Sequence, residues 1–161
     1  MTSRLLEPRS PAAWGDARRL VEEYAASLNL DLSFQNFAHE LEHFEGTYSP
    51  PSGAFLLAQD NGACVGCVGL RRLSDSTGEI KRLYVAPGAR GLGLGVALVR
   101  GIVEQGRKLG YARLVLDTLP SMLEARSLYQ AFGFKPVAPY RYNPVAGTAF
   151  LELQLLDQAG D

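Results

Sequence analysis

The sequence has little cysteine and histidine. Its 161 residues include two histidines and two cysteines, and Cys64 and Cys67 lie three positions apart in one predicted strand. Period-two geometry would point these two side chains to opposite faces. A disulfide between them is therefore disfavoured. Two ligands without a second pair or a nearby histidine also make a poor zinc site. We expect buried free thiols, as in a reducing cytoplasm.

Long hydrophobic runs and an excess of charge are also missing. No apolar run approaches the roughly 20 residues that a membrane helix needs, and residues 1–7 lack the apolar core of a signal peptide. Acidic and basic residues are interleaved, and the formal net charge is −1. This balance indicates no surface for nucleic acid or membrane. We expect a cytoplasmic protein that forms one domain over residues 1–161.

Hydrophobic periodicity predicts a mixture of helices and strands. Helices are predicted at about 12–28, 33–44 (with Ser33 as N-cap), 93–108 and 121–132. Strands are predicted at 3–7, 54–58, 63–71, 79–85, 111–118, 135–138 and 148–155. The strands from 54 to 85 form an antiparallel meander. Strand 79–85, helix 93–108 and the next strand form a βαβ unit, which makes the two strands parallel neighbours.

The chain is organised around residues 79–98, which read as a strand, a glycine-rich turn and the start of a helix. Pro87 and Gly88 end the strand, and glycines follow at positions 91, 93 and 95. A helix start offers unpaired amides and a partial positive charge, and glycines let phosphates approach them. The spacing fits neither the dinucleotide-binding nor the Walker pattern. The alternative to a pyrophosphate site is a helix start that needs tight packing.

Two motifs carry a family resemblance. The first is R-x-x-G-x-G at Arg90, Gly93 and Gly95, and the second is A-x-x-L-Y-x-x-x-G-F from Ala125 to Phe134. Together they resemble the GNAT superfamily of acyl-CoA-dependent N-acetyltransferases. The resemblance implies an α/β fold of mixed α+β type, with one mostly antiparallel sheet of six to seven strands flanked by helices. A splayed parallel strand pair would lie at its centre.

The resemblance also implies a site for acetyl-CoA as co-substrate, without a metal. Its pyrophosphate would bind backbone amides of Arg90, Gly91, Leu92, Gly93, Leu94, Gly95 and Val96. The Arg90 side chain would either add charge or order the turn. Backbone of Leu83, Tyr84 and Val85 would pair with the pantetheine arm. Residues 117–121 would supply polar contacts, with Thr118 near the thioester end, and Ala125 would also contact the cofactor. Met122 departs from the pattern, because relatives often carry an asparagine there.

Two residues are candidates for the chemistry. Tyr129 matches the tyrosine that protonates the departing thiolate in the family, and a hydroxyl with a pKa near 10 keeps its proton at neutral pH. Glu79 matches the general base of the histone-acetylating branch, and partial burial would raise its pKa toward useful values. Two alternatives remain open for Glu79. A water chain can replace it as base, or it can form an ion pair with Lys81 or a basic neighbour.

The acceptor site is expected between the first two helices and the loop joining the last two strands. Tyr48, Tyr140, Arg141, Tyr142 and Asn143 are its candidate residues. Arg141 would pair with an acceptor carboxylate and the tyrosines would wall an amine pocket, although a loop held by packing explains the same residues. The acceptor itself is a small-molecule or peptide amine. Since many relatives dimerise, a homodimer is one state that the resemblance allows.

The function that the sequence predicts is transfer of an acetyl group from acetyl-CoA to a primary amine by direct attack in a ternary complex. A non-catalytic acyl-CoA-binding sensor is the first alternative. The second is a zinc hydrolase, because His39-Glu40-Leu41-Glu42-His43 matches H-E-x-x-H. The zinc site would need a third ligand, and the chain has no third histidine.

Overall fold

The computed structural model describes residues 3–28 and 36–155 of the chain. The strands are β1 (Ser3–Leu6), β2 (Ala54–Asp60), β3 (Ala63–Arg72), β4 (Thr77–Val85), β5 (Arg113–Thr118), β6 (Lys135–Pro136) and β7 (Ala149–Gln154). The helices are α1 (Pro11–Leu28), α2 (Phe37–Glu42), α3 (Phe44–Thr47), α4 (Leu94–Lys108) and α5 (Leu123–Ala131).

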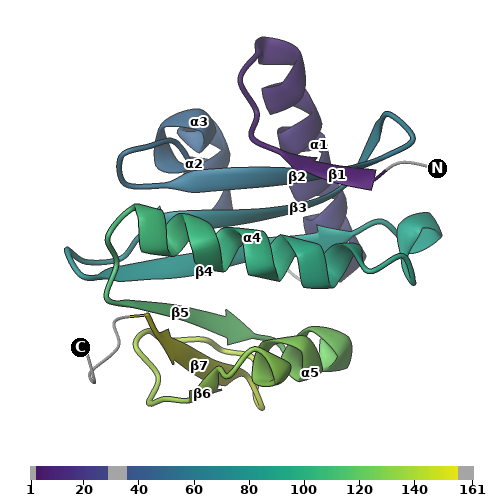
Figure 1. Ribbon diagram of the computed structural model, residues 1–161. Helices are drawn as coiled ribbons and strands as arrows, with labels where there is room; N and C mark the ends of the chain where they lie inside the picture. Colours follow the sequence, from purple (N-terminus) through teal and green to yellow (C-terminus); the bar gives the residue numbers. More distant parts are fainter. Residues whose placement is uncertain (1–2, 29–35, 156–161) are drawn as a thin grey trace.

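In this part of the chain the strands form one seven-stranded sheet in the order β1-β2-β3-β4-β5-β7-β6. All neighbouring strands are antiparallel except β4 and β5, which run parallel. The predicted fold class and the parallel βαβ pair are thus confirmed. A connection through α4 makes the parallel pairing possible, because parallel strands need a long crossover (Figure 1).

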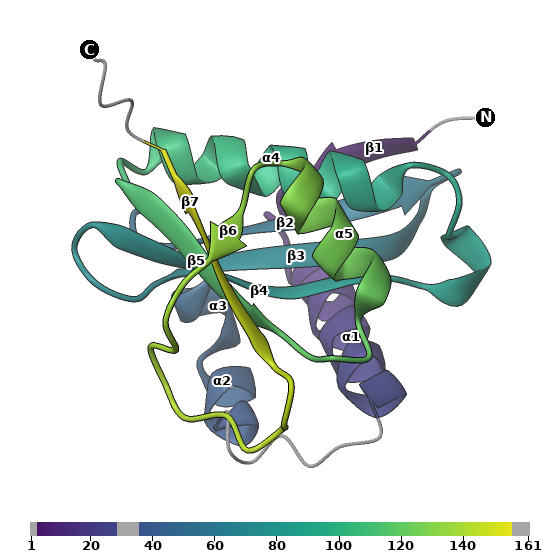
Figure 2. The same cartoon turned by 90° about the horizontal axis from the view of Figure 1, so that it is seen from below.

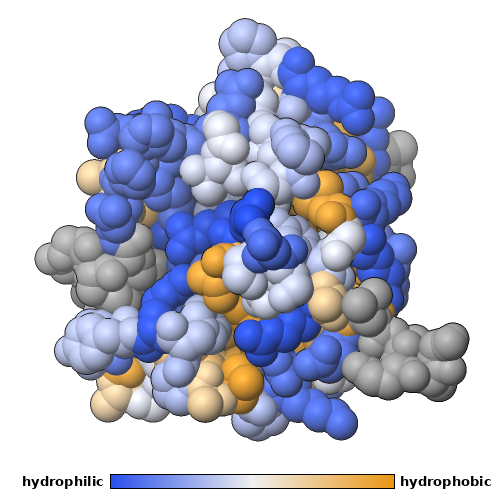
Figure 3. Space-filling view, turned by 90° about the vertical axis from the view of Figure 1, so that its left-hand side faces the viewer, coloured by the Kyte–Doolittle hydropathy of each residue, from blue (hydrophilic) through white to orange (hydrophobic). Residues whose placement is uncertain are grey.

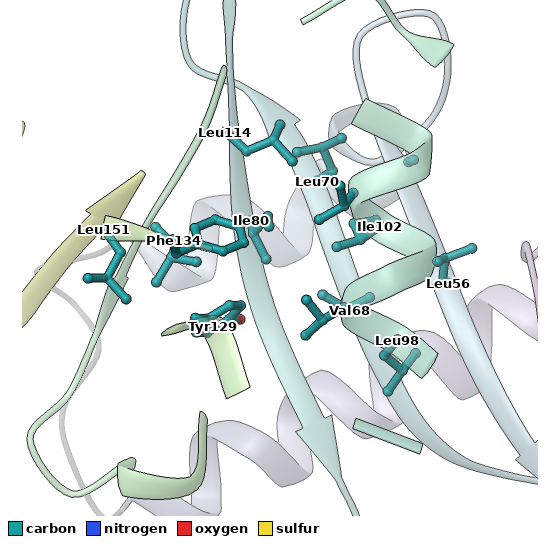
Figure 4. Close-up of a cluster of buried hydrophobic side chains, with 14 of the residues drawn as sticks. Leu56, Val68, Leu70, Ile80, Leu98, Ile102, Leu114, Tyr129, Phe134 and Leu151 are labelled. Atoms are coloured by element: carbon teal, nitrogen blue, oxygen red, sulfur yellow. The ribbon is translucent and has the colours of Figure 1, made fainter. Parts of the chain in front are cut away.

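The helices cover the two faces of the sheet (Figure 2). One cluster of buried side chains joins α4 and α5 to the sheet, and includes Leu98, Ile102, Leu114 and Tyr129 (Figure 4). A second cluster on the opposite face joins α1, α2 and α3 to β2–β4 through aromatic rings of Trp14, Phe44, Tyr48 and Phe55. The fold therefore has a separate apolar core on each side of the sheet.

Local signals explain where several elements begin and end. Pro11 is the first residue of α1, a position where proline's missing N–H group leaves no intrahelical hydrogen bond unmade. The Ser10 hydroxyl caps the helix by accepting a hydrogen bond from the Ala13 amide at 3.1 Å. The predicted second helix is divided at His43 into α2 and α3. Its predicted start and its predicted cap, Ser33, lie outside the described residues. The final strands are shorter than predicted, and β6 has two residues.

A β-bulge in β3 overturns the prediction that the cysteines face opposite ways. Gln59 pairs with Cys64 and Ala58 pairs with Gly66, which leaves Val65 as an inserted residue. Because the insertion shifts the alternation by one residue, Cys64 and Cys67 both pack on the α1 side. Both are free thiols, and burial raises the pKa of each.

A second bulge shapes β4. Lys81 pairs with Gly69 and Tyr84 with Cys67, so Arg82 and Leu83 together oppose one residue of β3. Arg82 adopts φ of 65° to make this bulge. As a result Ile80, Leu83 and Val85 pack in the α4 core. Period-two alternation along residues 79–85 predicts that Leu83 and Val85 share a face with Glu79 and Lys81. The bulge makes this prediction wrong.

The surface is mixed in character. On the face shown in Figure 3, hydrophobic residues form small groups separated by hydrophilic ones. Among the described helices, none is long and apolar enough to cross a membrane.

Candidate active site

The centre of the sheet opens where β4 and β5 separate. The two strands pair only at Thr77–Arg113, Gly78–Leu114 and Glu79–Val115, and the downstream parts diverge. A pocket of about 40 Å³ lies at this point. Its lining comes from α1, β4, β5, α5 and the β6–β7 loop: Tyr24, Ile80, Lys81, Arg82, Leu83, Asp117, Thr118, Leu119, Met122, Ala125, Tyr129 and Asn143. The predicted splayed pair thus opens onto a pocket that contains several predicted site residues.

Two hydroxyl groups in this pocket are available for a ligand. Thr118 is 3% exposed and its Oγ1 is buried without a hydrogen-bond partner among the described residues. Such an orphaned group is costly unless a ligand or water pairs with it. Tyr129 is also buried, packs edge-to-face on Phe134, and directs its oxygen toward β4 (Figure 4). Burial raises the pKa of Tyr129 well above its usual value, so the hydroxyl keeps its proton.

The glycine turn leads from β4 into a helix start that no side chain caps. Gly93 is the N-cap of α4 with φ of 79°, and it makes no side-chain capping bond. Gly91 also has positive φ, at 87°. Both positions are exposed, as are Leu92 and Val96. Since the first amides of a helix lack intrahelical partners, this end of α4 presents donors to an anion.

A hydrogen bond from Arg90 connects the glycine turn to the end of β4. The Arg90 Nε donates to the Val85 carbonyl at 2.9 Å, so this side chain orders the turn. Leu83 lines the pocket, whereas the Tyr84 side chain turns to the α1 side, where its hydroxyl donates to Glu23 at 3.4 Å. The backbone of β4 from residue 83 to 85 therefore runs from the pocket to the uncapped start of α4.

Glu79 is an ion-paired residue. Its side chain is fully buried, and it accepts from Arg71 Nε at 3.0 Å, Arg141 Nη2 at 2.8 Å and the Tyr140 hydroxyl at 2.9 Å. Burial alone would raise the pKa of Glu79. The charges of Lys81, Arg71 and Arg141 and the Arg141 hydrogen bond outweigh burial and lower the pKa to about 2. The expectation of a raised pKa is thus contradicted, and the ion-pair alternative describes this carboxylate.

The β6–β7 loop is held by these contacts on the same side of the sheet as α1 and α2 (Figure 2). Tyr140 and Arg141 both bind Glu79, so they hold the loop to β4. Asn143 lines the pocket, and its Nδ2 donates to Asp117 at 3.4 Å. Tyr142 is 78% exposed and lies outside the pocket lining. Of the predicted acceptor residues, Asn143 alone is part of that lining.

Tyr48 requires a correction, because it does not line this pocket. It is 1% exposed in the α1-side core, and its hydroxyl donates to Glu40 at 2.9 Å. A side chain at Gly69 would collide with the Tyr48 ring, which shows how closely the ring packs on β3. The aromatic residue before Pro50 is therefore a core residue.

Glu40 and Arg82 form a buried pair beside the pocket. Arg82 Nε and Nη2 donate to the two oxygens of Glu40 at 3.0 and 2.8 Å, and both side chains are 2% exposed. This pair joins α2 to the bulge in β4. It also weighs against the zinc-hydrolase alternative, because Glu40 would have to be the base. Within the described residues, no group of three potential ligands is placed to hold a metal.

Sequence reasoning missed Tyr24, Lys81 and Arg82 as pocket residues. Lys81 had a usable signal, because it is a charged residue in a strand predicted at the centre of the sheet. The bulge places the side chain of Arg82 on the same side of the sheet as that of Lys81, and no sequence pattern predicted this bulge.

The chain is similar to known proteins in sequence and in fold. The model of the acetyltransferase (GNAT) family matches residues 17–134. An uncharacterised N-acetyltransferase of Schizosaccharomyces pombe is 42% identical over 147 residues, which cover 90% of each chain.

Solved structures share the fold. An acetyltransferase of the GNAT family from Staphylococcus aureus superposes with a TM-score of 0.78 at 21% identity, covering 96% of this chain and 100% of that one. A second structure, a putative acetyltransferase from Salmonella typhimurium with its cofactor acetyl-CoA, gives a TM-score of 0.69 at 18% identity. It covers 100% of this chain and 98% of its own.

Proposed function

The chain belongs to the acetyltransferase (GNAT) family, and from this premise we propose that it transfers acetyl from acetyl-CoA to a primary amine of a small molecule or peptide. One observation carries the proposal. A glycine-rich, uncapped helix start lies directly after the strand that borders a pocket with two hydroxyls available for a ligand.

The residues present fit acetyl-CoA. Amides from Arg90 to Val96 would hold the pyrophosphate around the start of α4, where Gly91, Leu92, Gly93 and Val96 are exposed, while the Arg90 side chain keeps the turn in shape. The β4 backbone of Leu83, Tyr84 and Val85 would hold the pantetheine arm. Thr118 and Ala125 then lie at the thioester end, where the orphaned Thr118 hydroxyl gains a partner. When bound, acetyl-CoA supplies an activated acyl group on sulfur.

Tyr129 is proposed as the proton donor to that sulfur. Its hydroxyl lies inside the pocket and retains its proton because burial raises the pKa. In the transfer, the amine nitrogen bonds to the acetyl carbon and the carbon–sulfur bond breaks. Tyr129 gives its proton to the sulfur and is reprotonated by the proton that the amine loses, carried by water. Backbone amides at the β4 bulge would polarise the acetyl oxygen.

Glu79 is better assigned a positioning role than that of general base. A carboxylate with a pKa of about 2, already bound to Arg71, Arg141 and Tyr140, is a poor acceptor of an amine proton. We propose instead that water in the pocket removes the proton. In this account Glu79 holds Tyr140 and Arg141, and so keeps the β6–β7 loop beside the pocket.

The proposal is tested by measuring release of CoA thiol over a panel of primary amines, with calorimetric binding of CoA in parallel. Turnover with at least one amine, lowered strongly by Tyr129→Phe, is the expected result. Binding of CoA without turnover on any amine, and no effect of Tyr129→Phe, would instead identify a sensor that binds acyl-CoA. Absence of CoA binding would contradict the proposed function altogether.

A further inference from the structure

We propose that Arg126 is a positioning residue for acetyl transfer, which fixes Thr118 and the β6–β7 loop relative to each other on two sides of the pocket. The inference rests on the proposed function and adds to it a residue outside the pocket lining. Arg126 lies in α5, one turn before Tyr129. Its Nη2 donates to the Thr118 carbonyl at 3.3 Å and also to the Gly147 carbonyl.

The end of β5 has a neighbouring strand on one side only. In the described part of the chain β4 pairs with β5 as far as Val115, and beyond this residue β5 pairs with β7 alone. Thr118 is the last residue of β5 and pairs with Ala149, the first residue of β7. Gly147 lies two positions before Ala149. Arg126 therefore holds the backbone on both sides of the last pair of this ladder.

The two carbonyls that Arg126 binds belong to different sides of the pocket. Thr118 carries the hydroxyl assigned to the thioester end, and Asn143 of the β6–β7 loop lines the pocket as a predicted acceptor residue. The Val145 amide donates to Asn143 Oδ1 at 2.9 Å, and the Thr148 hydroxyl donates to the Val145 carbonyl at 2.7 Å. These bonds connect Asn143 to the segment around Gly147, so a shift at Gly147 would also move Asn143.

Stability alone does not explain an arginine at this position. The Nε atom of Arg126 is buried and has no hydrogen-bond partner among the described residues. A buried donor without a partner costs free energy, which the hydrogen bonds of Nη2 must offset before they stabilise the fold. Places where a folded chain keeps such a cost are commonly functional sites. We therefore expect the loss of Arg126 to reduce acetyl transfer more than it reduces stability.

Loss of Arg126 should lower kcat, because the acetyl group and the amine react only within a narrow range of relative positions. A misplacement of about 1 Å can lower a rate by about a hundredfold. We expect Arg126→Met to lower kcat by about ten- to a hundredfold and to raise KM for the amine, since the end of β5 and the loop are both released. The affinity for CoA should stay unchanged, because its proposed contacts at the start of α4 and along β4 do not involve Arg126.

The experiment measures initial rates of CoA release with saturating acetyl-CoA and the best amine of the panel. Calorimetric affinity for CoA and urea unfolding are measured on the same proteins. Arg100→Met is the matched control, because Arg100 is exposed in α4 and also contacts the end of α5. Its guanidinium carbon lies 5.8 Å from the centre of the Phe132 ring, outside the pocket lining. The control should leave kcat and KM unchanged.

A double-mutant cycle tests whether Arg126 acts through Thr118. Thr118→Val removes the hydroxyl and keeps the shape of the side chain. Without the hydroxyl its position no longer matters, so Arg126→Met should lower kcat by much less in the Thr118→Val protein than in the wild type. The rise in KM for the amine should remain in both proteins, because it comes from the loop. Arg126→Lys keeps a charged donor and should recover part of the lost kcat.

A wild-type kcat in Arg126→Met would overturn the inference and leave the proposed function intact. Equal losses of kcat in the wild-type and Thr118→Val proteins would also overturn it, as would a kcat that returns to the wild-type value once it is corrected for the folded fraction. If Arg126→Met fails to fold, Arg126→Gln replaces it in the cycle and the same outcomes decide. A wild-type protein that binds no CoA, or that binds CoA without turning over any amine, counts against the proposed function and against this inference with it.

Discussion

Replacing Glu79 by glutamine separates the two roles considered for this residue. Glutamine keeps the shape of the side chain and an oxygen for one donor, but removes the charge that Arg71 and Arg141 share. These arginines lie 3.0 and 2.8 Å from Oε1, and the glutamate side chain is fully buried. If Glu79 anchors the loop, its loss should reduce stability. If it is the base, its loss should reduce the chemical rate in a stable protein.

The size of the effect follows from the pKa. A value of about 2 in the folded protein, against an ordinary 4.5, corresponds to about 3 kcal/mol of stability. Because the folded pKa is the lower one, this contribution is complete above pH 4.5. It is lost as the pH falls toward 2. Glu79→Gln should therefore lower the free energy of unfolding by about 3 kcal/mol at pH 7 and by much less near pH 2.5.

Urea unfolding followed by circular dichroism, at pH 7 and at pH 2.5 to 4.5 in steps, measures this dependence. Glu152→Gln is the matched control, because Glu152 is also a strand glutamate paired with an arginine, Arg113. Its side chain and that of its partner are 24% and 37% exposed. An exposed pair contributes less, so we expect a loss under about 1 kcal/mol for the control.

Measuring kcat of the Glu79→Gln variant completes the test. In the fraction that remains folded, Glu79→Gln should change kcat by less than about tenfold and should leave the acidic limb of the pH–rate profile in place. A variant with wild-type stability and a kcat reduced by about a thousandfold would refute this reasoning. It would restore Glu79 as the general base.

Three further predictions concern other parts of the molecule. Glu40→Ala should cost about 3–5 kcal/mol in urea unfolding, because it removes the carboxylate that accepts two hydrogen bonds from the buried Arg82. Glu40→Leu combined with Arg82→Met should cost less, and equal losses would contradict this. Tyr129→Phe should lower kcat by about a hundredfold or more, while calorimetry should give an unchanged affinity for CoA. An unchanged kcat would show that Tyr129 is not the proton donor. Gly93→Ala should destabilise the fold by about 1 kcal/mol, because Gly93 has a φ of 79° that alanine disfavours. The same variant should bind CoA more weakly. Wild-type stability together with wild-type affinity for CoA would contradict both expectations.

Elements with strong local signals were predictable from the sequence. The βαβ unit around α4 and the motif from Ala125 to Phe134 gave the strand order at the sheet centre and the position of Tyr129. Tyr129 was located by the resemblance of its motif to the GNAT family, whereas the βαβ unit depends on short-range periodicity and turn residues, which a single sequence displays. The same is true of the glycine turn, where Gly91 and Gly93 have the positive φ that glycine permits.

Features that depend on long-range contacts were not predictable. The bulges at Val65 and Arg82 each reverse the alternation of a strand, and neither leaves a sequence signal. Glu79 meets Arg141 across 62 positions of sequence, so its environment emerges only in the folded chain. Tyr48 was assigned to the acceptor pocket from its place in a loop, yet its ring fills the core against Gly69.

The central claim is that amides at the start of α4 bind the pyrophosphate of CoA. Backbone amide chemical shifts of nitrogen-15-labelled protein, recorded during titration with CoA, test it most directly. We predict that the largest changes occur at residues 91–96. Saturating CoA that leaves these amides unmoved, or that shifts only residues elsewhere in the chain, would contradict the account.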